Sequence, residues 1–244
     1  MIAYNEDKYI EKSLDSLLAQ TYKNFILIIS DDGSTDRTQQ ICEDCVKKDK
    51  RIIYIRHNER KGSVFNFQYV LTQAKTPYFM WCGGHDIWHP RFAEKLLSAF
   101  KNNDIILSYP QSCEMNMEGV IGKTFNDECT TTHINSSVKR YLHVLWKISF
   151  NMGSLWYGIW STNALRNCDL FKTIFSDDIL LAQAAIIGKF RQHNEVLFFQ
   201  RINRKKEGYS QGIIRQVMAA NGGIPVKKIS TFSARYCLII YLSR

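Results

Sequence analysis

The sequence predicts an α/β protein with a doubly wound, mostly parallel sheet flanked by helices, followed by a less regular C-terminal part. Short apolar runs alternate with segments of helical periodicity through the first 110 residues, as strands alternate with crossover helices in such sheets. Polar or acidic turns follow several of these runs. The length of 244 residues, with 45% hydrophobic and 23% charged residues, suits one large domain with a sizeable core.

The first half of the chain contains the most regular pattern. A first helix that begins by about Asp7 leaves only residues 1–4 for a preceding strand, so an incomplete first strand is expected. Continuous apolar runs predict further strands at 25–30, 52–56, 78–81 and 105–110. Apolar residues at helical spacing predict helices at 7–19, 63–73 and 90–100, and another that is capped by Ser34, Thr35 or Asp36 and runs to about Lys47.

The pattern changes after residue 110. Residues 111–137 are polar and are expected to be irregular. The later patterns predict helices at 138–148, near Thr162 and at 177–188, with Gly188 as the C′ residue, and strands at 154–161 and 195–202. We therefore divide the chain into residues 1–110, residues 111–207 of the same domain, and a basic tail at 208–244.

The amino-acid composition restricts the class of binding partner and the cellular compartment that are expected. The formal charge of +9 and the pI near 9.2 favour an anionic partner, which is a nucleic acid, a phosphorylated small molecule or a membrane surface. Nucleic acid is not expected, because the chain has neither a binding motif nor an ordered stripe of aromatic and basic residues. The seven cysteines are odd in number and irregularly spaced, which is typical of reduced thiols. With no signal peptide and no apolar run of about 18 residues, a cytoplasmic protein is expected.

Three polar turns follow predicted strands and are expected to meet. They are Tyr4-Asn5-Glu6, the run from Asp31 to Ser34, and Gly84-His85-Asp86. In an open parallel sheet, ligands bind at the carboxyl ends of the strands. The sequence therefore predicts one crevice lined by all three turns.

Residues 3–38, "AYNEDKYIEKSLDSLLAQTYKNFILIISDDGSTDRT", resemble the opening of glycosyltransferase family 2 enzymes. The "YNE" turn, the helix end with "AQTY", the strand and "DDGSTD" occur in the order and spacing of that family. The resemblance continues through "KTPYFMW" and "DIWHP" and more faintly through "YGIW", "ALR" and "SDDILLAQAAIIGKF" to about residue 203. It implies a GT-A-like fold and an inverting enzyme that uses a nucleotide-sugar donor.

The resemblance implies a donor site in the first half of the chain. Ala3, Tyr4 and Glu6 would contact the base and ribose, and Asp32, with Asp31 beside it, would accept a hydrogen bond from the base. The alternative is that Asp31 and Asp32 only cap the following helix. Lys61 either reaches the diphosphate or is an exposed lysine without a ligand, and the arginine that the family often carries next to Asn66 is Phe65 here.

The third turn departs from the family pattern. A D-x-D element normally holds Mg²⁺ or Mn²⁺ against the donor diphosphate. Here Asp86 occupies the second acidic position and Gly84 the first. Three interpretations follow: Asp86 alone holds Mg²⁺ with phosphates and water, His85 joins it as a ligand and favours Mn²⁺, or metal binding is lost.

The resemblance also implies a catalytic base and an acceptor side. Counting back eleven residues from Gly188 gives Asp177 as the base, with Asp178 as the alternative; both would otherwise only stabilise the helix N-terminus. Arg201 is the best cation to close over the diphosphate. Trp156, Tyr157 and Trp160 either stack on a sugar or belong to the core.

We therefore expect a glycosyltransferase that moves a sugar from a UDP-, GDP- or dTDP-sugar to a glycan or lipid-linked acceptor with inversion. The alternative is a non-catalytic homologue that binds nucleotide or glycan and has lost the complete metal site. The basic, aromatic and aliphatic segment 230–244 predicts peripheral association with the inner face of the membrane, or else an ordinary docked helix.

Overall fold

The computed structural model describes residues 1–126, 128–148, 155–168 and 176–202, with the side chains of Ser176 and Asp177 excepted. The predicted tail, residues 208–244, lies outside the described residues. Within the described part, none of the helices is long and apolar enough to cross a membrane.

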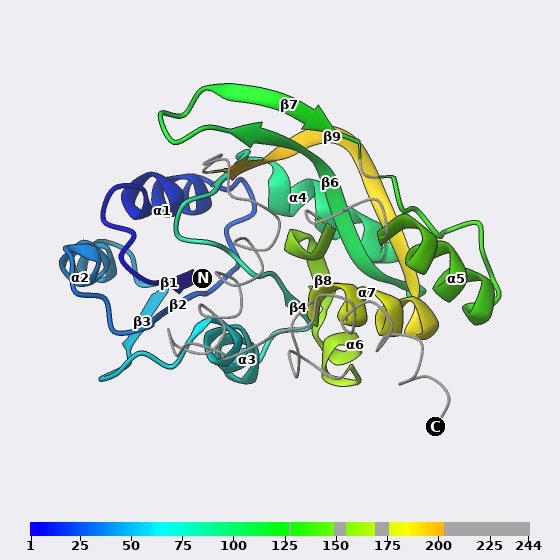
Figure 1. Cartoon of the computed structure of the whole chain (residues 1–244), viewed down its shortest axis with the longest axis horizontal. Coiled ribbons are helices and arrows are strands. Elements are labelled where there is room, and N and C mark those ends of the chain that lie inside the picture. The colour runs from blue at the N-terminus through cyan, green and yellow to red at the C-terminus, as the bar shows by residue number, and fades with distance from the viewer. Residues whose placement is uncertain (127, 149–154, 169–175, 203–244) are drawn as a thin grey trace, which may run out of the picture.

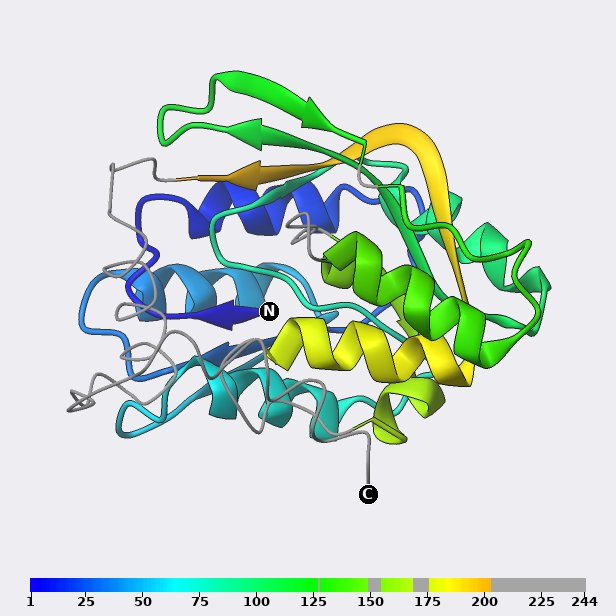
Figure 2. The same ribbon diagram turned by 45° about the vertical axis from the view of Figure 1, so that its right-hand side comes forward.

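The N-terminal half is built on a parallel sheet of three strands in the order β1 (Ile2–Ala3), β2 (Leu27–Asp31) and β3 (Ile52–Arg56). Helices α1 (Ile10–Leu18) and α2 (Thr38–Lys48) cover one face of this sheet, and α3 (Ser63–Gln73) covers the other (Figures 1 and 2). The short strand β1 also contacts the segment before the third polar turn, where the Ile2 amide donates to the Cys82 carbonyl at 3.0 Å.

The second half contains a mixed sheet. Its strands follow the order β4 (Tyr78–Phe79), β8 (Ile159–Ser161), β6 (Ile105–Met115), β9 (Lys189–Arg201) and β5 (Ile87–Trp88), and β7 (Ile121–Phe125) pairs with β6. Strands β6 and β9 are parallel, whereas the other pairings in this sheet are antiparallel. The helical elements here are α4 (Phe92–Leu97), η1 (Ser98–Lys101), α5 (Ser137–Ile148), η2 (Leu155–Tyr157), α6 (Thr162–Arg166) and α7 (Ser176–Ile187).

The predicted α/β class with helices on both faces of a parallel sheet is confirmed, and one expectation about residues 111–137 is wrong. Strand β6 continues to Met115 and turns back into β7 through Asn116, whose Oδ1 accepts from the Glu118 and Val120 amides at 3.1 and 2.8 Å. Gly119 takes a φ of 91°, which a side chain would strain. Sequence pattern missed β7 because this strand is largely exposed and has no buried face to impose alternation.

Gly188 ends α7 for a reason other than the one predicted. It is not among the described residues with positive φ, so the left-handed C′ role is absent. Instead, a Cβ at Gly188 would lie 2.4 Å from Ile106 Cγ2 and 3.0 Å from the Asp104 carbonyl oxygen. The glycine is therefore required by the close approach of the chain to β6.

The aromatic residues of the second half belong mainly to the core. Trp160 is fully buried and its Nε1 donates to the Trp156 carbonyl at 2.8 Å. Trp156 is 8% exposed and packs against Phe67 and Trp81. These contacts support the core interpretation of both tryptophans over sugar stacking.

Candidate functional site

The first two polar turns lie together, as predicted. Asn5 takes a φ of 54°, a left-handed conformation that asparagine tolerates. Its amide donates to Ser34 Oγ at 3.0 Å, and its Oδ1 accepts from the Thr35 amide at 2.9 Å. The Glu6 amide donates to Thr38 Oγ1 at 2.8 Å. The loop after β1 is thus tied to the loop after β2 by side chains that the sequence places in the two turns.

Asp31 organises its own turn. Its Oδ1 accepts from the amide and the hydroxyl of Ser34 at 2.8 and 2.6 Å, and its Oδ2 accepts from the Tyr54 hydroxyl at 2.6 Å. Burial and the bond to this carboxylate raise the pKa of Tyr54. The N-terminal amide of α2, that of Thr38, instead donates to Asp36 at 2.9 Å. Asp36, one of the three predicted caps, thus contacts the start of α2, but the residue in the N-cap position is Arg37, and its side chain makes no capping bond.

Asp32 fixes the loop that follows β3. Its carboxylate accepts from the amides of Lys61 at 2.6 Å and Gly62 at 3.0 Å, and its own amide donates to the Ala3 carbonyl at 2.9 Å. This loop brings the Arg60 guanidinium 4.0 Å from the centre of the Tyr4 ring and Arg60 Nε 3.8 Å from the Asp32 carboxylate. Tyr4 and Asp32, both predicted donor residues, thus share a neighbouring cation.

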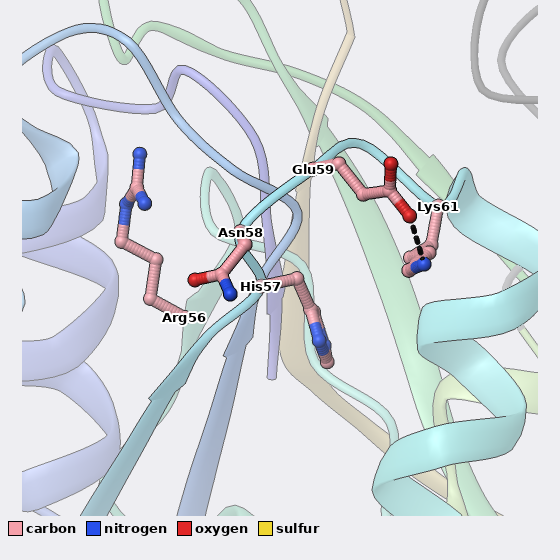
Figure 3. A pocket seen from close by; sticks show the side chains of 5 residues that line it. All are labelled: Arg56, His57, Asn58, Glu59 and Lys61. Carbon is pink, nitrogen blue, oxygen red and sulfur yellow. Dashed lines mark hydrogen bonds and ion pairs between the residues drawn. The ribbon is translucent and has the colours of Figure 1, made fainter.

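A pocket of about 600 Å³ opens at the same loop, lined by Arg56, His57, Asn58, Glu59 and Lys61 (Figure 3). The Lys61 ammonium pairs with the Glu59 carboxylate across one side of it. The His57 ring is fixed by two kinds of contact: its Nε2 bonds to Ser30 Oγ at 2.9 Å, and the ring lies edge-on to Phe65 and Tyr69. Phe65, at the position where the family often has arginine, therefore packs with aromatic rings.

The third turn joins the first through a histidine and a glutamate. His85 Nδ1 lies 2.8 Å from Glu6 Oε1, and a Cβ at Gly84 would approach Glu6 Cγ to 2.9 Å, so only glycine allows this contact. Burial opposes protonation of His85, but the hydrogen bond to Glu6 and the charges of Asp86 and Glu6 outweigh it and raise the pKa of His85 to about 9. His85 is therefore a cation at neutral pH.

Asp86 presents a buried carboxyl oxygen that has no partner. The residue has no exposed surface, and its Oδ1 accepts from the Arg201 amide at 2.9 Å. Its Oδ2 makes no hydrogen bond to the described residues and lies beside Gly83, where a Cβ would come within 2.9 Å. Burial raises the pKa of Asp86. An unsatisfied buried oxygen is costly, so a cation or hydrogen-bond donor from a ligand would stabilise this atom.

Arg201 locks the third turn to the β6–β7 hairpin. Its Nε donates to the His85 carbonyl at 2.9 Å, and its Nη1 donates to the carbonyls of Asn116 and Met117 at 2.8 and 3.0 Å. The guanidinium also lies 4.7 Å from the centre of the Tyr9 ring. Arg201 is 7% exposed, so it supports the turn by direct contacts and would act on a bound diphosphate mainly through its charge.

The predicted base lies at the start of α7. The backbone of Asp177 is the second residue of this helix, and its side chain lies outside what the structure describes. Asp178 follows it and is partly buried. The predicted helix start is confirmed by α7, whereas the role of either carboxylate stays a prediction.

The described residues fit a metal ion only in a limited way. They contain no group of three or more histidine, cysteine, aspartate or glutamate side chains that could hold one. Asp86 Oδ2 is a hard oxygen ligand without another partner, which suits Mg²⁺ or Mn²⁺ when phosphates and water supply the other ligands. The bond from His85 Nδ1 to Glu6 leaves Nε2, 3.9 Å from Asp86 Oδ1, as the atom that could join a metal after losing its proton. The unsatisfied Oδ2 supports Asp86 as a protein ligand, and the participation of His85 stays a prediction.

Sequence reasoning missed the residues that hold these groups in place. Arg60, Tyr54 and Tyr9 contact Tyr4, Asp31 and Arg201 respectively. No local pattern marks them, because each contact joins residues from separate elements. The one feature of the sequence that these three residues share is that each lies in or near a segment next to a predicted turn.

We expect the His85–Glu6 pair to stabilise the fold most at and below about pH 6.5. The pKa of His85 is raised from 6.5 to about 9, so the stabilisation is present below the lower value and is lost as the pH rises through the higher one. The melting temperature of the wild type minus that of His85→Gln should shrink across this window. The exposed His133→Gln is the control. A difference that stays constant from about pH 6.5 to above about 9 would contradict this assignment.

The fold and the clustered turns define a GT-A-type α/β protein. The family model "Glycosyl transferase family 2" matches residues 1–174, and the chain belongs to this family. An uncharacterized glycosyltransferase of Haemophilus influenzae is 33% identical over 126 residues, which are 50% of this chain and 39% of that protein. The teichoic acid poly(glycerol phosphate) polymerase of Staphylococcus epidermidis is 32% identical over 106 residues, 43% of this chain and 15% of the relative.

Solved structures share the fold at low sequence identity. S. aureus TarS 1–349 in complex with UDP-GlcNAc has a TM-score of 0.66 at 18% identity, covering 90% of this chain and 66% of TarS 1–349. The mannosyltransferase PcManGT from Pyrobaculum calidifontis, in complex with GDP-Man and Mn²⁺, has a TM-score of 0.61 at 14% identity, covering 89% and 59%. The chain spans 39%, 32% and 32% of the length of the first three curated relatives.

Proposed function

We propose that this chain transfers a sugar from a nucleotide-sugar donor to a glycan or lipid-linked acceptor with inversion. The observation that carries the proposal is the buried Asp86 Oδ2, which has no partner among the described residues, in a turn that is bonded to Glu6 of the first turn. Such an atom suits a site that is completed by a bound ligand. Membership of glycosyl transferase family 2 supports the same reaction.

The nucleotide would bind at the first two turns. Ala3, Tyr4 and Glu6 would border the base and ribose, and the Asp31–Asp32 turn would accept a hydrogen bond from the base. Asp32 already bonds two amides of the 57–62 loop, so it would also hold the pocket of Lys61 in shape. The solved relatives are complexed with UDP, UDP-GlcNAc and GDP-Man, which supports a UDP- or GDP-sugar, with a dTDP-sugar as a further candidate.

The diphosphate would lie against the third turn. Asp86 would hold Mg²⁺ or Mn²⁺ through Oδ2, and a bound ion of this kind neutralises charge on a departing diphosphate. Gly83 and Gly84, without a Cβ, allow the Asp86 and Glu6 side chains to lie against the backbone of this turn. His85 adds a positive charge beside Asp86, and Arg201 holds both in place through the His85 carbonyl and the Asp86 carboxylate.

The acceptor would be activated at the N-terminus of α7. Asp177, or Asp178 in its place, would remove the proton from the attacking hydroxyl as the new bond forms on the face opposite the leaving nucleotide. Direct displacement in one step inverts the sugar carbon. The relative from Staphylococcus epidermidis named as a teichoic acid polymerase supports a polymeric acceptor. A lipid-linked acceptor would place the reaction at the cytoplasmic face of a membrane.

A non-catalytic homologue is the second candidate, favoured by the lack of a three-ligand metal group among the described residues. Calorimetry with UDP, GDP and dTDP, with and without Mn²⁺, combined with assays of donor hydrolysis, separates the two. Metal-dependent binding with hydrolysis of the matching nucleotide-sugar supports transfer. Nucleotide binding without hydrolysis or transfer, across a panel of UDP-, GDP- and dTDP-sugars, supports the binding protein.

A further inference from the structure

Helix α5 carries a second apolar face that points to solvent. Val138, Leu142 and Trp146 are 64%, 57% and 68% exposed, and their spacing of four residues aligns them on one side of the helix. We call these three residues the α5 stripe. Monomeric proteins expose single apolar side chains freely, but an aligned stripe ending in tryptophan is typical of an interaction surface.

The opposite face holds α5 firmly to the body of the molecule. Val144 and Ile148 are buried in the core. Arg140 is buried between α5 and α7, where its Nε donates to the Ala185 carbonyl at 2.9 Å and its Nη2 to the Ile186 carbonyl at 3.1 Å. Figures 1 and 2 show the two helices side by side at one end of the molecule. The α5 stripe is therefore presented on a supported helix.

The charged residues of α5 itself have one sign. Residues 137–148 contain Lys139, Arg140 and Lys147 and no acidic residue. Lys139 is exposed and follows Val138, and Lys147 is partly exposed and follows Trp146. On a helix these lysines flank the stripe on one side. One acidic residue outside the helix, Glu128, acts through its charge on His143, which lies between Lys139 and Lys147 in the sequence.

We propose that α5 docks this chain on the surface of an anionic lipid bilayer. The α5 stripe would enter the boundary between headgroups and acyl chains, with the helix lying in the plane of the membrane. Lys139 and Lys147 would contact anionic headgroups, which attract basic residues near the surface. Charge complementarity favours this partner over a second copy of the chain, because each copy has a formal charge of +9 and would bring the same lysines to the contact. The proposal is independent of sugar transfer.

The test uses the full chain with sedimenting vesicles of phosphatidylcholine alone or with phosphatidylglycerol. We expect binding to the anionic vesicles that weakens as salt is raised. Leu142→Ser together with Trp146→Ser should lower the partition coefficient about tenfold or more, because burial of one leucine side chain already contributes that much. Lys139→Gln should lower it about fivefold. The control is Val120→Ser with Ile121→Ser, two residues that are 63% and 61% exposed on the β6–β7 hairpin.

Trp146 provides a direct readout. The other four tryptophans, Trp81, Trp88, Trp156 and Trp160, are at most 8% exposed. Lipids brominated on their acyl chains should therefore quench Trp146 selectively, and anionic vesicles should protect it from acrylamide. The proposal is overturned if the wild type does not bind anionic vesicles, if the stripe variant binds as well as the hairpin control, or if light scattering shows that the stripe variant instead abolishes a dimer.

Discussion

Asp86→Asn is expected to reduce sugar transfer by about 10²-fold or more, the range found when a single group that stabilises transition-state charge is removed. Asparagine retains an oxygen for the Arg201 amide, so the third turn should keep its shape. It loses the negative charge that a divalent ion requires. The variant should therefore fold and lose both transfer and the Mn²⁺ dependence of donor binding.

Steady-state kinetics and calorimetry with the nucleotide-sugar that best stabilises the protein in thermal shift would measure these two losses. Asp44→Asn is the matched control, since Asp44 is a half-exposed carboxylate on α2 that pairs with Lys47 at 2.9 Å. Wild-type transfer and unchanged Mn²⁺ dependence in Asp86→Asn would remove Asp86 from the site. A parallel loss of melting temperature would show that its role is structural.

Asp177→Asn is expected to lower transfer by about 10²-fold to 10⁴-fold, the usual contribution of a general base, with donor binding unchanged. The base acts on the acceptor hydroxyl, so its loss should appear in kcat. An acidic residue at a helix N-terminus contributes about 0.3 to 1 kcal/mol to stability, and the variant should lose no more than this.

Asp178→Asn is the comparison, because Asp178 is the neighbouring carboxylate in the same first turn of α7. If Asp178 is the base, Asp178→Asn should lose transfer and Asp177→Asn should retain it. Full activity in both variants would exclude this helix start as the source of the base. If the loss of transfer parallels unfolding measured by circular dichroism, only a structural role of the helix terminus would remain.

The organisation of the site was largely predictable because its turns are local in sequence. The first two turns directly follow the parallel strands β1 and β2, whose carboxyl ends lie at one edge. The third turn follows β4 of the mixed sheet, and the bridge between Ile2 and Gly83 brings it to the same edge. The bonds from Asn5 to Ser34 and from Glu6 to His85 confirm that the three turns meet. The residues that hold these turns were not predictable. Arg201 reaches His85 across 116 positions, and no local pattern records such a contact.

The sequence by itself determined the α/β class, most helices and strands, and the family to which the chain belongs, because periodicity and short motifs depend on neighbouring residues. Only the tertiary structure decided that β6 and β7 form a hairpin, that Gly188 serves close packing, and that Asp86 Oδ2 is buried without a partner among the described residues. These properties depend on which distant segments approach each other. Burial and hydrogen-bond satisfaction are set by that approach, and so is the charge state of His85 beside Glu6 and Asp86.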